Sequence, residues 1–196
     1  MSDIGILLQK DTFSQEEIVR LLNANAEERG LLYSKAAEIK AENVGNVVYF
    51  RGLIEFSNIC SKDCYYCGIR KSNHQAKRYN LSDEEILNAA RFAYESNYGS
   101  VVLQGGELSG PAFTKRITNL VKGIKQLSGD KLGITLSVGE QTPEVYRQWF
   151  EAGAHRYLLR IESSDRDLYY RIHPQDDSHR FDQRLQALYD LKEAGY

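Results

Sequence analysis

Hydrophobic positions along the chain follow two alternating patterns. Short runs rich in β-branched and aromatic residues, typical of buried strands, occupy residues 47–56, 100–104, 133–138 and 156–162. Between and after these runs, hydrophobic residues recur at helical spacing over residues 82–97, 112–127, 143–152, 167–172 and 181–194. Strands that alternate with helices in this way predict an α/β fold with a parallel sheet, either doubly wound or closed into a barrel.

A separate helical pattern precedes the first strand. Ser14 and Glu17 form a capping box ahead of a first helix, and a second helix is expected over residues 26–42. We therefore expect residues 1–45 to be an N-terminal helical extension that packs onto a main domain of residues 46–196.

Local signals also mark two helix starts in the main domain. Ser82 and Glu85 form another capping box. Pro143 suits a first helical turn, where its missing N–H would have no partner in any case. We expect helices to begin at both points.

Composition narrows the class of protein. Of the 196 residues, 42% are hydrophobic and 27% are charged, and the formal net charge is −2. This balance is typical of a globular domain. It provides no excess of positive charge that would attract nucleic acid or an anionic membrane surface. The chain shows neither a leader peptide nor a run of about 20 apolar residues, so we expect a cytoplasmic protein.

Polar residues directly after the expected strands are predicted to face one another. Ligand sites of parallel βα folds lie at the carboxyl ends of the strands. The residues in these positions are Cys60, Cys64 and Cys67, then Gly105, Gly106 and Glu107, then Ser137 and Glu140, and finally Arg160 and Glu162.

The three cysteines are the strongest chemical signal. They have the spacing C-x3-C-x2-C and lie within eight positions, so they do not fit the disulfide framework of a secreted protein. Three thiolates can hold a four-iron, four-sulfur (4Fe-4S) cluster with one iron left open. The amino and carboxylate groups of S-adenosylmethionine (SAM) can chelate that iron. The alternative is a zinc site with His74 as the fourth ligand.

Two further segments suit a bound ligand. The glycines at 105 and 106 allow a ligand to approach the backbone, and Glu107 offers a carboxylate to an ammonium group. The alternative is a tight turn with an exposed glutamate, whereas a phosphate loop is excluded because the Gly-Lys-Ser/Thr ending is missing. Arg160 and Glu162 lie two apart in an expected strand and so point to one side, where they would meet a ligand or form an internal salt bridge.

These motifs closely resemble those of the radical SAM maturases of FeFe-hydrogenase of the HydE type. Biotin synthase and methylornithine synthase are similar, but the endings Gly68-Ile69-Arg70 and Tyr157-Leu158-Leu159-Arg160 favour the HydE type. The resemblance covers nearly all of the chain from about residue 46, in segments 53–60, 64–70, 77–79, 102–107, 136–140 and 151–162.

The resemblance implies a radical SAM TIM-type (βα)8 barrel, of which this chain would be about the first half and part of a longer protein. It implies that Cys60, Cys64 and Cys67 ligate the 4Fe-4S cluster. It also implies a set of SAM-binding residues: Gly105, Gly106 and Glu107 at the amino group, Ser137 near the methionine portion, Tyr66 beside the adenine, Glu162 at the ribose, and Arg184 at the carboxylate. Arg160 is a further candidate for binding SAM. Arg180 is the rival of Arg184, and the helical register favours Arg184.

The resemblance further implies reductive cleavage of SAM to a 5'-deoxyadenosyl radical during hydrogenase maturation. The expected partners are a small-molecule or organometallic iron–cysteine substrate, an external electron donor and other hydrogenase maturases. One alternative is methylornithine synthase or another biotin-synthase-like activity. Another, from a different class, is a scaffold that binds an iron–sulfur cluster or zinc without radical chemistry.

Overall fold

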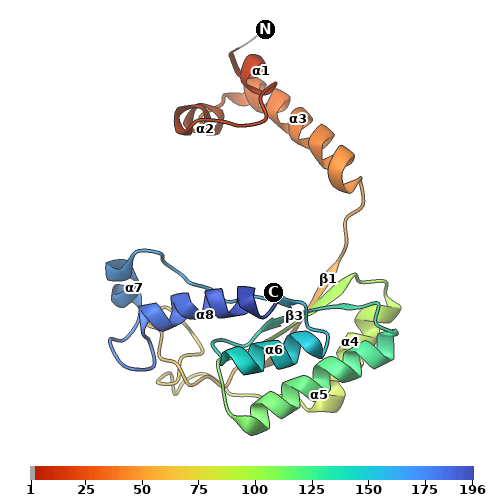
Figure 1. Cartoon of the computed structure of the whole chain (residues 1–196), viewed down its shortest axis with the longest axis vertical. Helices are drawn as coiled ribbons and strands as arrows, with labels where there is room; N and C mark the ends of the chain where they lie inside the picture. Colours follow the sequence, from red (N-terminus) through yellow and green to blue (C-terminus); the bar gives the residue numbers. More distant parts are fainter. Residues whose placement is uncertain (1–2) are drawn as a thin grey trace. The chain divides into compact units, whose positions relative to one another are not determined.

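The computed structural model describes residues 3–196, and contacts divide the chain into two compact units that meet between Val48 and Tyr49. The first unit consists of the helices α1 (Asp3–Leu7), α2 (Gln15–Leu22) and α3 (Ala26–Val44) (Figure 1). The expected capping box of Ser14 with Glu17 is confirmed at the start of α2. Helix α1 was not expected, because five residues are too few to establish a helical period.

The second unit is built on a sheet of four parallel strands in the order β1-β2-β3-β4. The strands are β1 (Arg51–Ser57), β2 (Ser100–Gly105), β3 (Gly133–Ser137) and β4 (Arg156–Tyr157). Each of the first three is followed by one helix, α4 (Asp83–Glu95), α5 (Pro111–Ser128) and α6 (Pro143–Glu151), and β4 is followed by α7 (Arg166–Ile172) and α8 (Phe181–Glu193). The predicted parallel sheet of βα units is therefore confirmed, and it has the order of a partial (βα) barrel.

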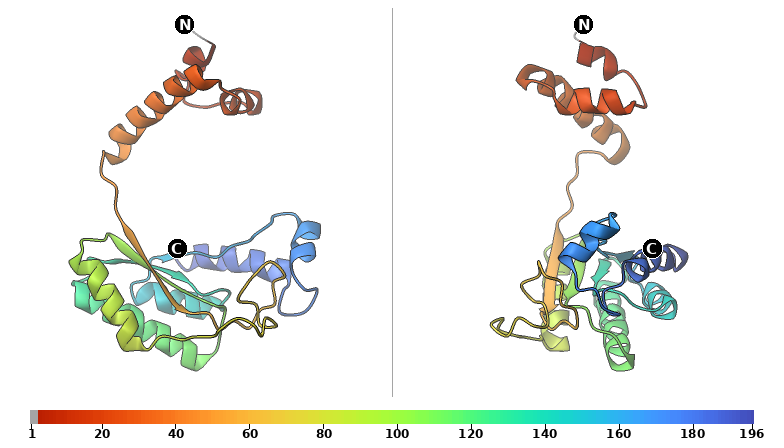
Figure 2. Two further views of the ribbon diagram at one scale, coloured as in Figure 1. Left: turned by 180° about the vertical axis from the view of Figure 1, so that it is seen from behind. Right: turned by 90° about the vertical axis from the view of Figure 1, so that its left-hand side faces the viewer.

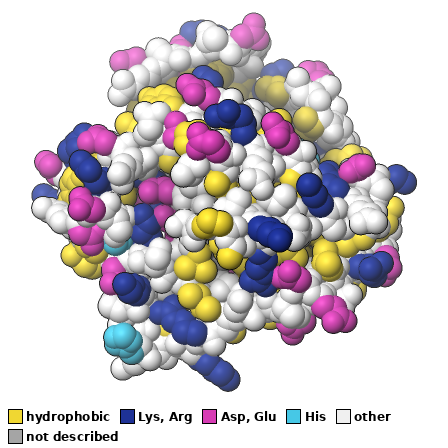
Figure 3. Space-filling model, turned by 60° about the horizontal axis from the view of Figure 1, so that its bottom comes forward, with side chains coloured by type: hydrophobic (Ala, Val, Ile, Leu, Met, Phe, Trp, Pro, Cys, Tyr) yellow, Lys and Arg dark blue, Asp and Glu magenta, His cyan; other side chains and the backbone are white. Residues whose placement is uncertain are grey.

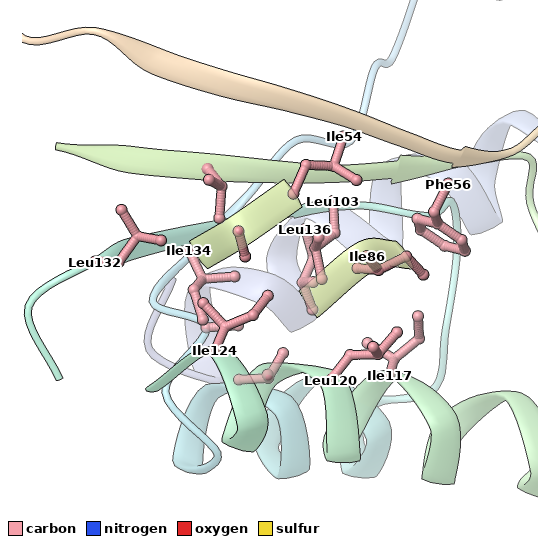
Figure 4. Close-up of a cluster of buried hydrophobic side chains, with 14 of the residues drawn as sticks. Ile54, Phe56, Ile86, Leu103, Ile117, Leu120, Ile124, Leu132, Ile134 and Leu136 are labelled. Atoms are coloured by element: carbon pink, nitrogen blue, oxygen red, sulfur yellow. The ribbon is translucent and has the colours of Figure 1, made fainter. Parts of the chain in front are cut away.

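The main core lies between the sheet and the helices on one of its faces (Figures 1 and 2). Alternate strand residues point toward α4 and α5, as Figure 4 shows for Ile54, Leu103 and Leu136 against Ile117 and Leu120. All five are at most 7% exposed. Burying each such side chain contributes about 1.5–3 kcal/mol, which is why these hydrophobic positions hold α4 and α5 against the sheet.

A smaller core joins α6 to α8. Tyr146 of α6 is fully buried against Ala187, Leu191 and Ala194 at the C-terminal end of the chain. This contact brings α8 beside the sheet and determines which of its residues can reach the strand ends.

The local helix signals of the second unit are also confirmed. Ser82 accepts a hydrogen bond from the backbone N–H of Glu85, and the Glu85 carboxylate accepts one from the backbone N–H of Ser82. Pro143 is in the first turn of α6. Each feature satisfies or removes a backbone group that a helix start leaves without a partner.

Two expected strands were too long. The first run, 47–56, forms a strand only from Arg51, and the last, 156–162, forms one only at Arg156 and Tyr157. The fourth strand is short because its one partner, β3, ends at Ser137, so that residues after Leu158 have no backbone to pair with. Side-chain composition favours extended structure there, but a strand also requires a neighbouring strand.

No helix within residues 3–196 is long and apolar enough to cross a membrane. On the face that Figure 3 shows, acidic and basic side chains are intermixed, with groups of hydrophobic side chains between them. This distribution agrees with the formal net charge of −2.

Replacing Leu120 by alanine tests the core. Leu120 is 1% exposed beneath the sheet, so Leu120→Ala should lower the free energy of unfolding by about 2–5 kcal/mol. Leu168→Ala is the matched control, because Leu168 is 46% exposed and should change it by less than about 0.5 kcal/mol. Urea unfolding followed by circular dichroism measures both, and equal effects would contradict the assignment of the core.

Candidate active site

The carboxyl ends of the four strands surround one cavity of about 170 Å³. Parallel strands all end at the same edge of the sheet, which is why segments distant in sequence meet there. The cavity is lined by Cys60, Lys62, Cys64, Tyr66, Cys67 and Ile69 after β1, by Gln104, Gly105, Gly106 and Glu107 at the end of β2, by Ser137 and Gly139 after β3, by Leu158, Leu159, Arg160 and Glu162 after β4, and by Arg184 of α8. Every residue that sequence analysis assigned to the cluster or to SAM is in this set.

The three cysteines are free thiols, partly exposed toward the cavity. The Cys60 sulfur accepts hydrogen bonds from the backbone N–H groups of Lys62, at 3.4 Å, and of Glu107, at 3.3 Å. Such amides stabilise negative charge on sulfur. Burial raises the pKa of the Cys64 thiol, so metal binding at this position requires the loss of a proton.

The donor set fits a cluster better than a single zinc ion. His74, the proposed fourth ligand of a zinc site, does not line the cavity. Within residues 3–196, no three His, Cys, Asp or Glu side chains gather closely enough to share one ion. In a 4Fe-4S cluster each thiolate binds a different iron, so the ligands need only face a common space, as these three do.

A close approach of two backbones joins the cysteine loop to the end of β2. A Cβ at Gly106 would lie 2.2 Å from the Ile59 carbonyl oxygen and 2.8 Å from the Cys60 Cβ, so only glycine fits there. The Ser61 N–H and hydroxyl both donate to the Glu107 carbonyl oxygen, at 2.9 and 2.8 Å. The glycine therefore places Glu107 directly beside the cysteines.

Four charged side chains form a ring at the edge of this cavity. The Lys62 ammonium lies 3.0 Å from one Glu107 carboxylate oxygen and 3.4 Å from one of Glu140. The Arg184 guanidinium lies 3.1 Å from the other Glu107 oxygen and 2.7 Å from the other Glu140 oxygen. We call these four residues the charged ring. Their side chains are only 10% to 18% exposed, so the turn with an exposed glutamate is not what forms at Glu107.

Pairing outweighs burial in this ring. Burial lowers the pKa of Lys62, but attraction to Glu107 and Glu140 has the larger combined effect, and the pKa is raised. The same opposition of burial and attraction raises the pKa of Arg184. Both cations therefore stay charged, as buried ions must when each has partners of opposite sign.

Three members of the charged ring were expected from the sequence, and the fourth was not. Glu107, Glu140 and Arg184 were expected at the site or at the strand ends. Lys62 was not, because a lysine between two cysteines of a loop is ordinarily solvated and nothing in its spacing indicates burial. Its position between two metal-ligand candidates is the one signal that could have identified it.

The last residue of α7 and the segment after it also hold the cysteine loop. The backbone N–H of Asp63 donates to Nε2 of His179, at 2.9 Å, and the N–H of Tyr65 donates to the carbonyl oxygen of Ile172, at 3.0 Å. His179 is 3% exposed, and its Nδ1 lies 2.7 Å from a carboxylate oxygen of Asp176. The loop therefore depends on a segment more than 100 residues away.

Tyr66 extends from the same loop into the cavity. Its hydroxyl lies 3.4 Å from Nε2 of His173, and the two rings meet edge to face with centroids 5.4 Å apart. His173 is buried and has Nδ1 2.9 Å from the carbonyl oxygen of Tyr169. The tyrosine is exposed, so it is not a core aromatic, and its ring is available to a ligand.

Arg160 and Glu162 both line the cavity, but the prediction that they lie on one side of a strand was wrong. They do not belong to a strand, and Glu162 has a positive φ of 61°. Both are exposed, and within the described part of the chain no ion pair joins them, so the internal salt bridge is not formed. A turn in the chain, and not strand alternation, brings both to the same space.

The two candidate arginines lie in different places. Arg184 lines the cavity and is 8% exposed. Arg180 is the residue before the first turn of α8 and borders a different hollow, with Tyr170 and Asp176. One helical turn therefore separates the residue at the site from the residue outside it.

Replacing Gly106 by alanine tests the close approach. Because the added Cβ would collide with backbone, Gly106→Ala should lower the free energy of unfolding by about 1–3 kcal/mol and reduce iron uptake by the cysteines. Gly68→Ala is the control, because nothing lies within 4 Å of a Cβ at that position. Denaturant unfolding and iron analysis after anaerobic reconstitution measure both effects, and normal iron uptake by Gly106→Ala would count against this geometry.

Comparison with known proteins places the site in a family. Residues 54–196 match the model of the Radical SAM superfamily. The chain is 41% identical to the [FeFe] hydrogenase maturase subunit HydE of Thermotoga maritima over 193 residues, which are 96% of this chain and 53% of that protein. It is 30% identical to the biotin synthase of Magnetococcus marinus, over 90% of this chain and 54% of that protein.

Solved structures agree with this placement. The crystal structure of methylornithine synthase (PylB) superimposes with a TM-score of 0.80 and 26% identity, covering 98% of this chain and 56% of that one. The FeFe-hydrogenase maturase HydG from Carboxydothermus hydrogenoformans gives a TM-score of 0.82 and 25% identity, over 99% of this chain and 46% of that one. The chain spans about half the length of the relatives it matches. With its family model, its fold and its cysteine motif in agreement, the chain belongs to the radical SAM superfamily.

Proposed function

We propose that the protein cleaves SAM reductively at a 4Fe-4S cluster held by Cys60, Cys64 and Cys67, and that it acts in FeFe-hydrogenase maturation. The observation that carries this proposal is the meeting of the three cysteines with Glu107 and Arg184 around one cavity at the strand ends. When bound, the reduced cluster supplies the electron that breaks a C–S bond of SAM, leaving methionine and a 5'-deoxyadenosyl radical.

The residues of the chain bind and orient SAM. Glu107 offers a carboxylate to the ammonium group of the ligand, and Arg184 offers a guanidinium to its carboxylate. The charges of the pair are therefore complementary to those of an amino acid. Gly105 and Gly106 allow the ligand to approach the backbone, and Ser137, which pairs with Gln104 on the neighbouring strand, lines the same cavity.

Three further residues of the cavity lining suit the nucleoside of SAM. Glu162 provides a carboxylate for ribose hydroxyls, and Arg160 lies two residues before it. Tyr66 provides an exposed aromatic ring for the adenine. Within residues 3–196 neither Arg160 nor Glu162 takes part in an ion pair, so a ligand that binds them displaces no such partner.

Hydrogenase maturation is the finer part of the proposal. It is supported by 41% identity to HydE over 96% of this chain. The substrate would be a small molecule or an organometallic iron–cysteine species, with an external electron donor and other hydrogenase maturases as partners. The second candidate is a methylornithine-synthase-like or biotin-synthase-like activity, favoured by the superposition on PylB and by the identity to biotin synthase. Product analysis with each substrate class separates the two.

Reductive SAM cleavage tests the reaction. Full-length protein, reconstituted anaerobically with iron and sulfide and reduced with dithionite, should convert SAM to 5'-deoxyadenosine and methionine. Cys60→Ala, Cys64→Ala and Cys67→Ala should each abolish 5'-deoxyadenosine formation, because each removes a thiolate ligand. Tyr65→Phe is the control, since this exposed tyrosine lies between two of the cysteines but does not line the cavity. A complete 4Fe-4S spectrum without SAM binding or cleavage would favour the scaffold alternative.

Charge removal at Glu162 tests whether this residue binds the nucleoside of SAM. Glu162→Gln should raise the dissociation constant of SAM about tenfold, because the amide nitrogen cannot accept hydrogen bonds from ribose hydroxyls. Glu151→Gln, an exposed position on α6, should leave the constant unchanged. Isothermal titration with the cluster-loaded protein measures both, and equal affinities for Glu162→Gln and wild type would remove Glu162 from the binding site.

A further inference from the structure

Lys62 is fully engaged by the protein itself. An ammonium group has three donor hydrogens, and three acceptors surround this one. They are a Glu107 oxygen at 3.0 Å, a Glu140 oxygen at 3.4 Å and the carbonyl oxygen of Ser178. The residue is 9% exposed. Because no donor is left over, Lys62 acts on other residues of the site and not on a ligand directly.

The backbone of Lys62 belongs to the cysteine loop. The residue lies two positions from Cys60 and two from Cys64, and its N–H donates to the Cys60 sulfur. Its carbonyl oxygen accepts from the N–H of Lys71 at 2.8 Å, which holds the loop closed. Lys62 is thus attached to the cysteine loop by its backbone and to Glu107 by its side chain.

This double attachment matters because the ring is electrically balanced. Two cations alternate with two carboxylates, so the formal charges of the four members cancel. Without Lys62, Glu107 and Glu140 would share Arg184 as their one cationic partner in the ring, and a negative charge would remain in a space where water cannot screen it. Both carboxylates would then compete for Arg184, and Glu107 would lose the contact that directs its first oxygen.

We infer that Lys62 is a positioning residue that sets the distance between the cysteine loop and the Glu107–Arg184 pair, and so determines how the amino-acid end of SAM meets the cluster. The inference rests on the proposed function, because it concerns the same cavity. It adds Lys62, and Glu140 as its second anchor, to the residues on which SAM recognition depends.

The experiment compares Lys62→Met, Lys62→Arg and Lys71→Met in the full-length, anaerobically reconstituted protein. Methionine removes the charge of Lys62 at similar volume, arginine keeps it, and Lys71 is an exposed lysine of the neighbouring loop. Three readouts are measured: iron content, the SAM dissociation constant by isothermal titration, and the change in the electron paramagnetic resonance spectrum of the reduced cluster when SAM is added.

Lys62→Met should keep the iron content and the SAM-free spectrum, weaken SAM binding at least tenfold and lose the SAM-induced spectral change. Lys62→Arg should recover part of both, and Lys71→Met should match wild type. A Lys62→Met protein that binds SAM within twofold of wild type and shows the full spectral change overturns the inference.

A second variant keeps the test decisive if Lys62→Met fails to hold iron. Glu140→Gln removes the second anchor from outside the cysteine loop and should also weaken SAM binding at least tenfold, whereas unchanged binding overturns the inference. Failure of the proposed function has a different signature. If wild type carries a full cluster but binds no SAM, both proposals fall. If wild type binds SAM and the Lys62 and Glu140 variants bind it equally well, only the positioning role falls.

Discussion

Four charged side chains share a space from which water is largely excluded, and each is kept there by the other members of the charged ring. Lys62, Glu107, Glu140 and Arg184 come from the cysteine loop, the end of β2, the loop after β3 and helix α8. Burying any one of these charges alone would cost several kcal/mol. The ring therefore forms only when all four segments are folded against one another. The ring therefore ties the cysteine loop to the strand ends.

The sheet brings the four segments together. Four parallel strands end at one edge, and α4 and α5 bury the alternate hydrophobic residues of the sheet against a common core. Packing of α8 against Tyr146 of α6 then brings Arg184 to the same edge. The hydrophobic contacts of the two cores thus position the polar groups of the cavity, although those polar groups are not part of either core.

The site also divides into two regions with different physical character. Around Glu107 and Arg184 the charges are buried and already paired, so the ligand of the proposed function would have to enter a ring of existing ion pairs. Around Tyr66, Arg160 and Glu162 the side chains are exposed. Under the proposed function, recognition of SAM at the first region would depend on exchange of ion pairs. Recognition at the second would depend on newly made hydrogen bonds and ring contacts.

Much of this could be predicted from sequence, because the relevant signals are local. Capping boxes at Ser14 and Ser82, helical spacing and short runs of β-branched and aromatic residues each operate within a few residues. For the second unit they yielded the element order and the parallel sheet, whereas the short helix α1 was not expected. The strand-end rule then brought together the cysteines, Glu107 and Ser137, since it depends only on element order. Arg184 lies on a helix and was expected only from the family resemblance. The length of β4 and the burial of Lys62 could not be predicted in this way. A strand lasts only as far as its neighbour, and a lysine is buried only where carboxylates from other segments meet it, so both were decided by the tertiary structure.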